Sequence, residues 1–139
     1  MIVHTVLLMT GVLAAIAPST PIARITIASG TSQSAHAMVA VGTNQYETTF
    51  EKPLVAHVVP ANAKVRFTCV TPGCTFPPQI MAENANRAGP NAFDVDADTD
   101  TGIASISFVV RTLSVQPVTV VAQSPSGRGP SVRFVLIAR

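Results

Sequence analysis

The sequence has little of what nucleic-acid recognition usually requires. It contains no tryptophan and one tyrosine, only 12% of its residues are charged, and its formal net charge is +2. The lysines and arginines are scattered along the chain rather than gathered into a basic patch. Because nucleic-acid-binding domains combine such a patch with aromatic side chains that stack on bases, the composition argues against a nucleic-acid partner.

The residue patterns of common enzyme classes are also missing. There is no glycine-rich phosphate loop, and only two histidines, His36 and His57, follow the first segment of the chain. His57 lies between Ala56 and Val58, where an exposed strand histidine is expected, and no Ser, Cys or Asp is spaced to act as its partner. Two histidines without a His/Cys cluster argue against a zinc site. We therefore expect a protein that is not an enzyme and holds no cofactor.

One long apolar run stands at the amino terminus, over residues 6–17 (VLLMTGVLAAIA). Ala15 and Ala17 are the small residues that signal peptidase requires, and the run is shorter than the roughly 18 to 20 residues that span a bilayer. We expect residues 1–17 to be a signal peptide that is removed, although the opening MIVH contains no Lys or Arg. The alternative is a buried strand or helix. Export would leave residues 18–139 as a secreted, cell-surface or periplasmic protein without a transmembrane helix.

The rest of the chain alternates apolar and polar residues in short segments. The clearest segment is 64–69 (KVRFTC), in which Val65, Phe67 and Cys69 alternate with polar side chains. This two-residue period is typical of strands with one buried face and one exposed face. The predicted strands are residues 22–28, 54–59, 64–69, 103–110, 118–123 and 131–138, with weaker examples at 37–41 and 92–96.

The spacing of these strands and of the Gly, Pro, Asn, Asp and Ser turns between them favours one all-β domain over residues 18–139. We expect an immunoglobulin-like β-sandwich of about seven to eight antiparallel strands. The longest stretch without alternation is residues 75–90 (TFPPQIMAENANRAGP), which is longer than most connections and is predicted to be a surface loop that binds a partner. The predicted contact residues are Gln79, Glu83, Asn84, Asn86 and Arg87.

A series of short motifs runs in order through the chain. They are residues 29–35 (SGTSQSA), 41–43 (VGT), 50–54 (FEKPL), 65–67 (VRF), 73–76 (GCTF), 99–104 (TDTGIA) and 118–122 (VTVVA). Their order resembles the "SG-x-x-Q-x-A … VG … F-x-x-PL", "V-x-F", "G-x-x-F", "TDxxGxA" and "Y-x-V-x-A" motifs of bacterial immunoglobulin-like domains of the invasin and intimin type. The chain departs from that family where a "D-x-x-G-x-P-V" hairpin is shortened to residues 60–63 (PANA).

The resemblance implies a non-catalytic exported module with a binding, adhesion or structural role. Its partner would be a protein or another envelope or cell-surface component, contacted through loops or through a sheet edge. Members of the family typically occur as tandem modules, so a passive spacer, or a fragment of a longer tandem-repeat surface protein, is the alternative. A small periplasmic enzyme or inhibitor is the least favoured function.

Cys69 and Cys74 enclose the turn-forming residues 70–73 (VTPG), which can bring their side chains to disulfide distance. In an oxidising compartment we expect a structural bridge that pins a loop rather than a redox site, which usually has two intervening residues. The alternative is that Cys69, which has inward parity, is a free buried thiol.

Four aspartates, Asp94, Asp96, Asp98 and Asp100, alternate through FDVDADTD and would line one face of an extended strand. Carboxylates gathered in this way suit Ca²⁺, but the run lacks the glycine and the final acidic residue of an EF-hand loop. We expect no metal site here, and favour a charged edge strand that discourages aggregation over the weaker calcium hypothesis.

Overall fold

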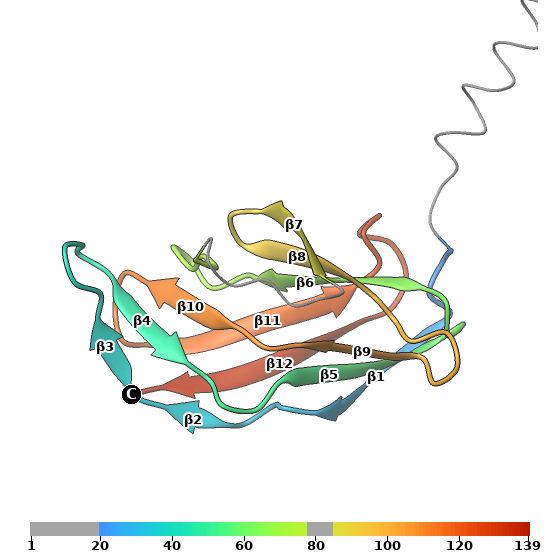
Figure 1. Cartoon of the computed structure of the whole chain (residues 1–139), viewed down its shortest axis with the longest axis horizontal. Coiled ribbons are helices and arrows are strands. Elements are labelled where there is room, and N and C mark those ends of the chain that lie inside the picture. The colour runs from blue at the N-terminus through green and yellow to red at the C-terminus, as the bar shows by residue number, and fades with distance from the viewer. Residues whose placement is uncertain (1–19, 78–84) are drawn as a thin grey trace, which may run out of the picture.

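The computed structural model describes residues 20–77 and 85–139, and in these residues it contains strands but no helix. The predicted signal peptide therefore lies outside the described residues. Within the described ranges, no helix is long and apolar enough to cross a bilayer. The strands, most of which follow the long axis of the molecule (Figure 1), are β1 (Arg24–Ser29), β2 (Ser34–Ala35), β3 (Ala37–Val39), β4 (Tyr46–Thr49), β5 (Leu54–Val59), β6 (Lys64–Cys69), β7 (Ala85–Gly89), β8 (Ala92–Asp96), β9 (Ile103–Ile106), β10 (Val109–Thr112), β11 (Pro117–Gln123) and β12 (Ser131–Ala138).

Hydrogen bonding joins these strands into three sheets. The largest has the order β2-β12-β11-β6-β8-β7, and the two smaller sheets have the orders β1-β5-β9 and β10-β4-β3. Neighbouring strands are antiparallel except for β2 and β12, which are parallel. Only Ser107 and Phe108 separate β9 from β10, so the two smaller sheets follow one another along the molecule (Figure 1).

A single hydrophobic core joins the sheets. Every second side chain of the central strands is buried, as the two-residue alternation predicts. The largest fully buried side chains are Phe67, Phe93, Phe134, Leu54, Ile106, Leu136, Val58, Val65, Val95, Val110, Val118 and Val120. They come from both the small sheets and the large sheet and belong to one cluster, so the prediction of a β-sandwich-like, all-β fold is confirmed.

The predicted strand over residues 103–110 is broken in two. β9 ends at Ile106 and β10 begins at Val109. At the break Phe108 is buried, where its ring stacks on Phe50 with 5.4 Å between the centroids and meets the edge of Phe76 at 6.2 Å. The aromatic cluster therefore fills the core at the junction of the two small sheets.

Three strands have no counterpart in the sequence-based prediction: β2, β4 and β7. The predicted loop over residues 75–90 is wrong in part, because Ala85–Gly89 forms β7 and Thr75 pairs with Arg111 in an isolated bridge. Phe76 is buried in the core rather than exposed. Residues 78–84 lie outside the described residues.

The turn from β8 to β9 depends on Gly102. Its φ is +71°, a left-handed conformation that favours glycine, and a Cβ at this position would collide with the carbonyl oxygen of Val58. This close approach of the two backbones allows the Val58 N–H to donate a hydrogen bond to the Gly102 carbonyl at 2.8 Å. The turn therefore fastens the β9 end of the sheet onto β5.

Candidate functional site

The predicted contact residues are only partly described. Gln79, Glu83 and Asn84 lie outside the described residues, whereas Asn86 and Arg87 lie on β7, at the edge of the six-stranded sheet. The side chain of Asn86 is exposed. Arg87 is half-buried and is already engaged within the fold.

Three backbone carbonyls accept hydrogen bonds from the Arg87 guanidinium. Nη1 donates to Gly89 at 3.0 Å, and Nη2 donates to Phe76 at 2.8 Å and to Pro77 at 2.9 Å. The guanidinium also lies 4.9 Å from the centre of the Phe93 ring, which is a cation–π distance. Arg87 therefore holds the chain around residues 76–77 against β7 and β8, which is a structural role.

The four aspartates do not form a cluster. Asp94 accepts two hydrogen bonds from Arg66, at 2.7 and 3.0 Å, and these bonds raise the pKa of Arg66. Asp96 forms a longer ion pair with Lys64, at 3.7 Å. Among residues 20–77 and 85–139, no group of three potential metal-binding side chains is close enough to hold a metal ion.

The expectation of a charged edge strand at this place is wrong. β8 pairs with β6 on one side and with β7 on the other, so it is an interior strand. Strand β8 ends at Asp96, so Asp98 and Asp100 lie in the following turn. The run of alternating aspartates is instead explained by cross-strand pairing, because Asp94 and Asp96 lie opposite the basic residues Arg66 and Lys64 of β6.

The disulfide between Cys69 and Cys74 is present, with the two Cα atoms 6.0 Å apart. Both cysteines are buried, so the free-thiol alternative for Cys69 is wrong. Hydrogen bonds fix the enclosed loop to β11: the Thr71 hydroxyl accepts from the Thr119 N–H at 2.9 Å, and the Val70 N–H donates to the Thr119 carbonyl at 3.0 Å. The bridge pins this loop beside the end of the sheet.

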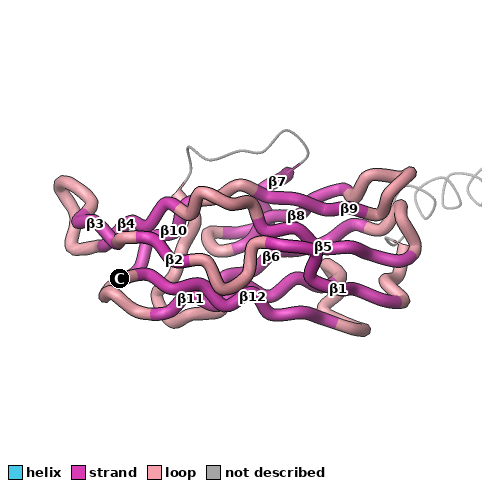
Figure 2. Tube along the Cα trace, turned by 90° about the horizontal axis from the view of Figure 1, so that it is seen from below, coloured by secondary structure: helices cyan, strands magenta, loops and turns pink. Residues whose placement is uncertain are grey.

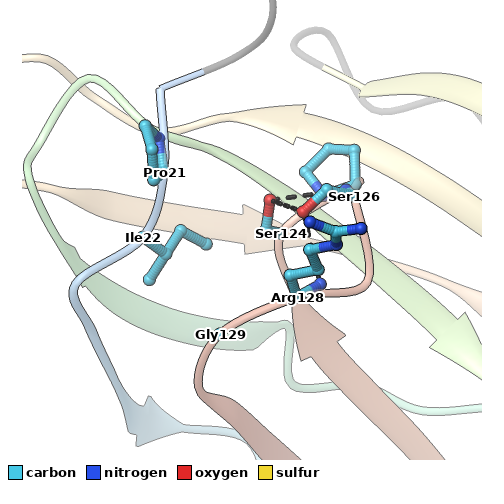
Figure 3. Close-up of a pocket in the computed structure, with 7 residues that line it drawn as sticks. Pro21, Ile22, Ser124, Ser126, Arg128 and Gly129 are labelled. Carbon is cyan, nitrogen blue, oxygen red and sulfur yellow. Dashed lines mark hydrogen bonds between the residues drawn. The ribbon is translucent and has the colours of Figure 1, made fainter.

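A cavity of about 590 Å³ lies between the start of the described chain and the β11–β12 turn (Figure 3). Pro21, Ile22 and Pro125 supply apolar walls, and Ser124 and Ser126 face one another with their hydroxyl oxygens 3.1 Å apart. These hydroxyls are used by the turn itself, since they accept from the N–H groups of Ser126 and Arg128. No His, Asp or Glu is among the described residues that line the cavity, so neither serine has a general base beside it.

A second, smaller cavity of about 350 Å³ lies on the outer face of the β10-β4-β3 sheet. Its floor carries the ion pair of Arg111 and Glu47, whose Nε and Oε2 atoms are 3.0 Å apart. Next to Glu47 in the register is Met38, and His36 also lines the cavity. This cavity adjoins the surface that carries the most exposed large hydrophobic residues of the described chain.

The surface formed by Met38, Val39, Val41 and Leu113, which we call the apolar end, exposes large hydrophobic side chains to solvent. Val41 is 98% exposed, Met38 is 70% exposed and Val39 is 66% exposed. Leu113 is 62% exposed, and the other exposed large hydrophobic residues of the described chain, which are about half exposed, are Val70, Val115, Val135 and Ile137.

The strand register places these residues toward one end of the molecule. Val39, Tyr46 and Thr112 form one row across β3, β4 and β10, so the chain beyond this row carries both Val41 and Leu113. Ile137 lies opposite Pro117, at the start of β11 and just after Val115. Val70 and Val135 lie on either side of Thr119, two residues further along β11.

The β3–β4 turn projects beyond the neighbouring strands at the end of the molecule that also holds the C-terminus (Figure 2). The turn is well hydrogen-bonded, since the Ala40 carbonyl accepts from the Thr43 N–H at 3.1 Å and from its hydroxyl at 2.9 Å. Sequence reasoning predicted a weak strand over residues 37–41 but no functional role for it. The feature of the sequence that could have indicated an exposed apolar surface is the uncharged run AMVAV over residues 37–41.

Together these features define a β-sandwich-like, all-β protein with one disulfide and an exposed apolar end. Comparison with protein-family models, with curated proteins and with solved structures returned no match.

Proposed function

We propose that the chain is an exported, non-catalytic, immunoglobulin-like module of the invasin and intimin type that contacts an envelope component through its apolar end. The sheet order supports the immunoglobulin-like assignment. β1, β5 and β9 form one sheet, while β6, β11 and β12 are neighbours in the other, which is the partition of the first, second and fifth strands against the third, sixth and seventh in immunoglobulin domains. β2, β3, β4, β7, β8 and β10 are additions to that plan.

The Cys69–Cys74 disulfide supports the proposed export. Disulfides persist in oxidising compartments and are rare in the cytosol. The apolar run over residues 6–17 supplies a signal peptide for that route. We therefore place the processed chain at the cell surface, in the periplasm or in the medium.

The observation that carries the binding function is the exposure of Met38, Val39 and Val41 on a projecting hairpin. Exposed apolar patches with polar rims mark surfaces that contact proteins or membranes. The surrounding groups are polar, and the Arg111–Glu47 pair beside the hairpin is one such rim. The residues that line the larger cavity include no base beside Ser124 or Ser126, so we take the exposed apolar surface as the functional candidate.

Co-sedimentation with native envelope fragments tests this function. The wild-type chain should pellet with the fragments, and a Met38→Ser/Val41→Ser/Leu113→Ser variant should remain in the supernatant because it lacks the projecting apolar groups. Val135→Ser is the matched control, since Val135 is also exposed but lies on β12 rather than on a projecting loop. Equal pelleting of the wild type and the triple variant, or pelleting of neither, would contradict the binding function.

A second candidate function is that of a passive spacer in a longer surface protein. The first described residues and Arg139 lie at opposite ends of the long axis in both views, as in modules that follow one another in line (Figures 1 and 2). A spacer needs no exposed apolar end, so this function is favoured if the wild-type chain does not bind the envelope fragments.

A further inference from the structure

The apolar end combines residues of β3 with residues of two separate connections. Val41 comes from the β3–β4 turn and Leu113 from the β10–β11 connection. Leu113 rests on the disulfide loop at Gly73, where an added Cβ would lie 2.8 Å from Leu113 Cδ1. The result is a set of projecting side chains at one end of the sandwich.

The acidic side chains near the apolar end and at the opposite end differ in whether they are paired. In the two rows of the β10-β4-β3 sheet nearest the apolar end, the acidic side chain is Glu47, and Arg111 neutralises it at 3.0 Å. Asp98 and Asp100 are instead exposed in the β8–β9 turn, where the described chain has no exposed large hydrophobic residue. Within this sheet the acidic group beside the apolar end is therefore held in an ion pair, while the exposed Arg139, whose carbonyl accepts from the Ala37 N–H, adds a cation at the same end.

Several backbone groups of the projecting β3–β4 turn are hydrogen-bonded within the turn itself. The Ala40 N–H donates to the Gln45 carbonyl at 2.9 Å, and the Ala40 carbonyl accepts two bonds from Thr43. The Thr43 hydroxyl accepts in turn from the Gln45 N–H at 3.2 Å. Hydrogen bonds made inside the turn lower the cost of taking its polar groups out of water.

We infer that the apolar end inserts shallowly into the interface of a lipid bilayer, with Met38, Val41 and Leu113 as the inserting side chains. This inference rests on the proposed function and specifies its partner. Shallow insertion gains free energy in proportion to the apolar area removed from water and requires no matching shape. The net charge of +2 is small, so the apolar side chains rather than anionic lipid must supply the binding.

A lipid surface fits these observations better than a protein partner. Protein interfaces concentrate their binding energy in Trp, Tyr and Arg that fill pockets of the partner. The projecting residues are instead Met, Val and Leu, and the nearby Arg111 is already paired with Glu47. Val41 and Leu113 come from connections at one end of the sandwich, a placement that suits a soft, deformable surface.

Co-sedimentation with protein-free phosphatidylcholine vesicles tests the inference. The purified chain, as the producing cell processes it, should bind, and the Met38→Ser/Val41→Ser/Leu113→Ser variant should bind at least about tenfold more weakly, since one fully buried side chain of this kind can contribute about that factor. Val135→Ser should bind as the wild type does. Because insertion is apolar, binding should change little between about 0.05 and 0.5 M salt.

Each other outcome would overturn the inference. Binding to native envelope fragments without binding to protein-free vesicles would show that the partner is an envelope component other than the lipid surface and would leave the proposed function standing. Vesicle binding that the triple variant retains would assign it to another surface. Sedimentation that instead shows a concentration-dependent dimer without vesicle binding would make a second copy the partner. Since the three substituted side chains are exposed, an unchanged circular dichroism melt verifies that the variant is folded.

Discussion

Asp98 shows how one exposed carboxylate can organise a turn. Its Oδ1 accepts hydrogen bonds from the N–H of Asp100 at 2.8 Å and from the N–H of Thr101 at 3.0 Å. These bonds favour the ionised form and lower the pKa of Asp98, the bond from Asp100 having the larger effect. The carboxylate therefore supports the turn that presents Gly102 to β5.

The charge of Asp98 should contribute to stability only above acid pH. A carboxyl whose pKa is lower in the folded state than in the unfolded state stabilises the fold above its unfolded pKa, about 3.9, and this contribution disappears as the pH falls through the folded value. Asp98→Asn keeps an acceptor oxygen but removes the charge, so its melting temperature should be below wild type at pH 7, and the difference should shrink as the pH falls below about 3.9.

Asp100→Asn is the control for this measurement. It removes a charge from the same turn while leaving the carboxylate bonds of Asp98 in place. A melting-temperature difference between Asp98→Asn and wild type that stays constant from pH 7 to acid pH would show that the charge does not stabilise the turn.

At the scale of strands, β7 shows what sequence periodicity cannot reveal. Its residues, ANRAG, have low strand propensity and no alternation of apolar and polar side chains. It forms because β8 supplies a pairing edge and because Arg87 binds the carbonyls of Phe76 and Pro77, which precede the strand, and of Gly89 at its end. Both causes depend on residues distant in sequence or on side-chain geometry, so the segment was predicted to be a loop.

Arg87 and Asn86 separate a structural role from a binding role on this strand. Arg87→Gln should lower the free energy of unfolding by about 2 kcal/mol, because it removes charge-assisted hydrogen bonds to three carbonyls and the contact with Phe93. Asn86→Ala, at an exposed position on the same strand, should change it by less than about 0.5 kcal/mol. Chemical denaturation measures both. Equal stability of Arg87→Gln and wild type would return Arg87 to the list of binding residues.

The strands that alternation did predict share a physical property. β5, β6 and β12 have the bounds that were predicted, because each turns one face toward the core and so alternates buried with more exposed side chains. In β3 the same kind of pattern misleads, since Met38 and Val39 point to opposite faces and both are exposed. Alternation identifies a strand but not its place in a sheet, so the apolar end became visible only when β3 was seen to lie at an edge.

At the scale of the whole molecule, the two ends of the sandwich differ in character. One end carries the exposed apolar residues, and the other carries the Asp98 turn and the cavity beside the first described residues. The chain therefore enters at the polar end and reaches the apolar end at its last strand (Figure 1). An attachment through the amino-terminal side would point the apolar end outward, which is the orientation that binding to a surface requires.

Whether the core or the disulfide holds this two-ended arrangement together can be measured. The two bridged cysteines are only five residues apart in the sequence, so in the chain-entropy model the disulfide contributes roughly 2 kcal/mol to the free energy of unfolding. The hydrophobic core, by contrast, spans all three sheets. Cys69→Ala/Cys74→Ala should therefore still unfold in one cooperative transition, with a lower guanidinium midpoint. Reductant should lower the wild-type midpoint similarly and leave the double variant unchanged. Just beyond the disulfide loop, Phe76 joins the aromatic cluster with Phe93 and Phe108. Loss of cooperative unfolding in the variant would mean that the small sheets need the disulfide loop and this cluster to stay packed against the large sheet.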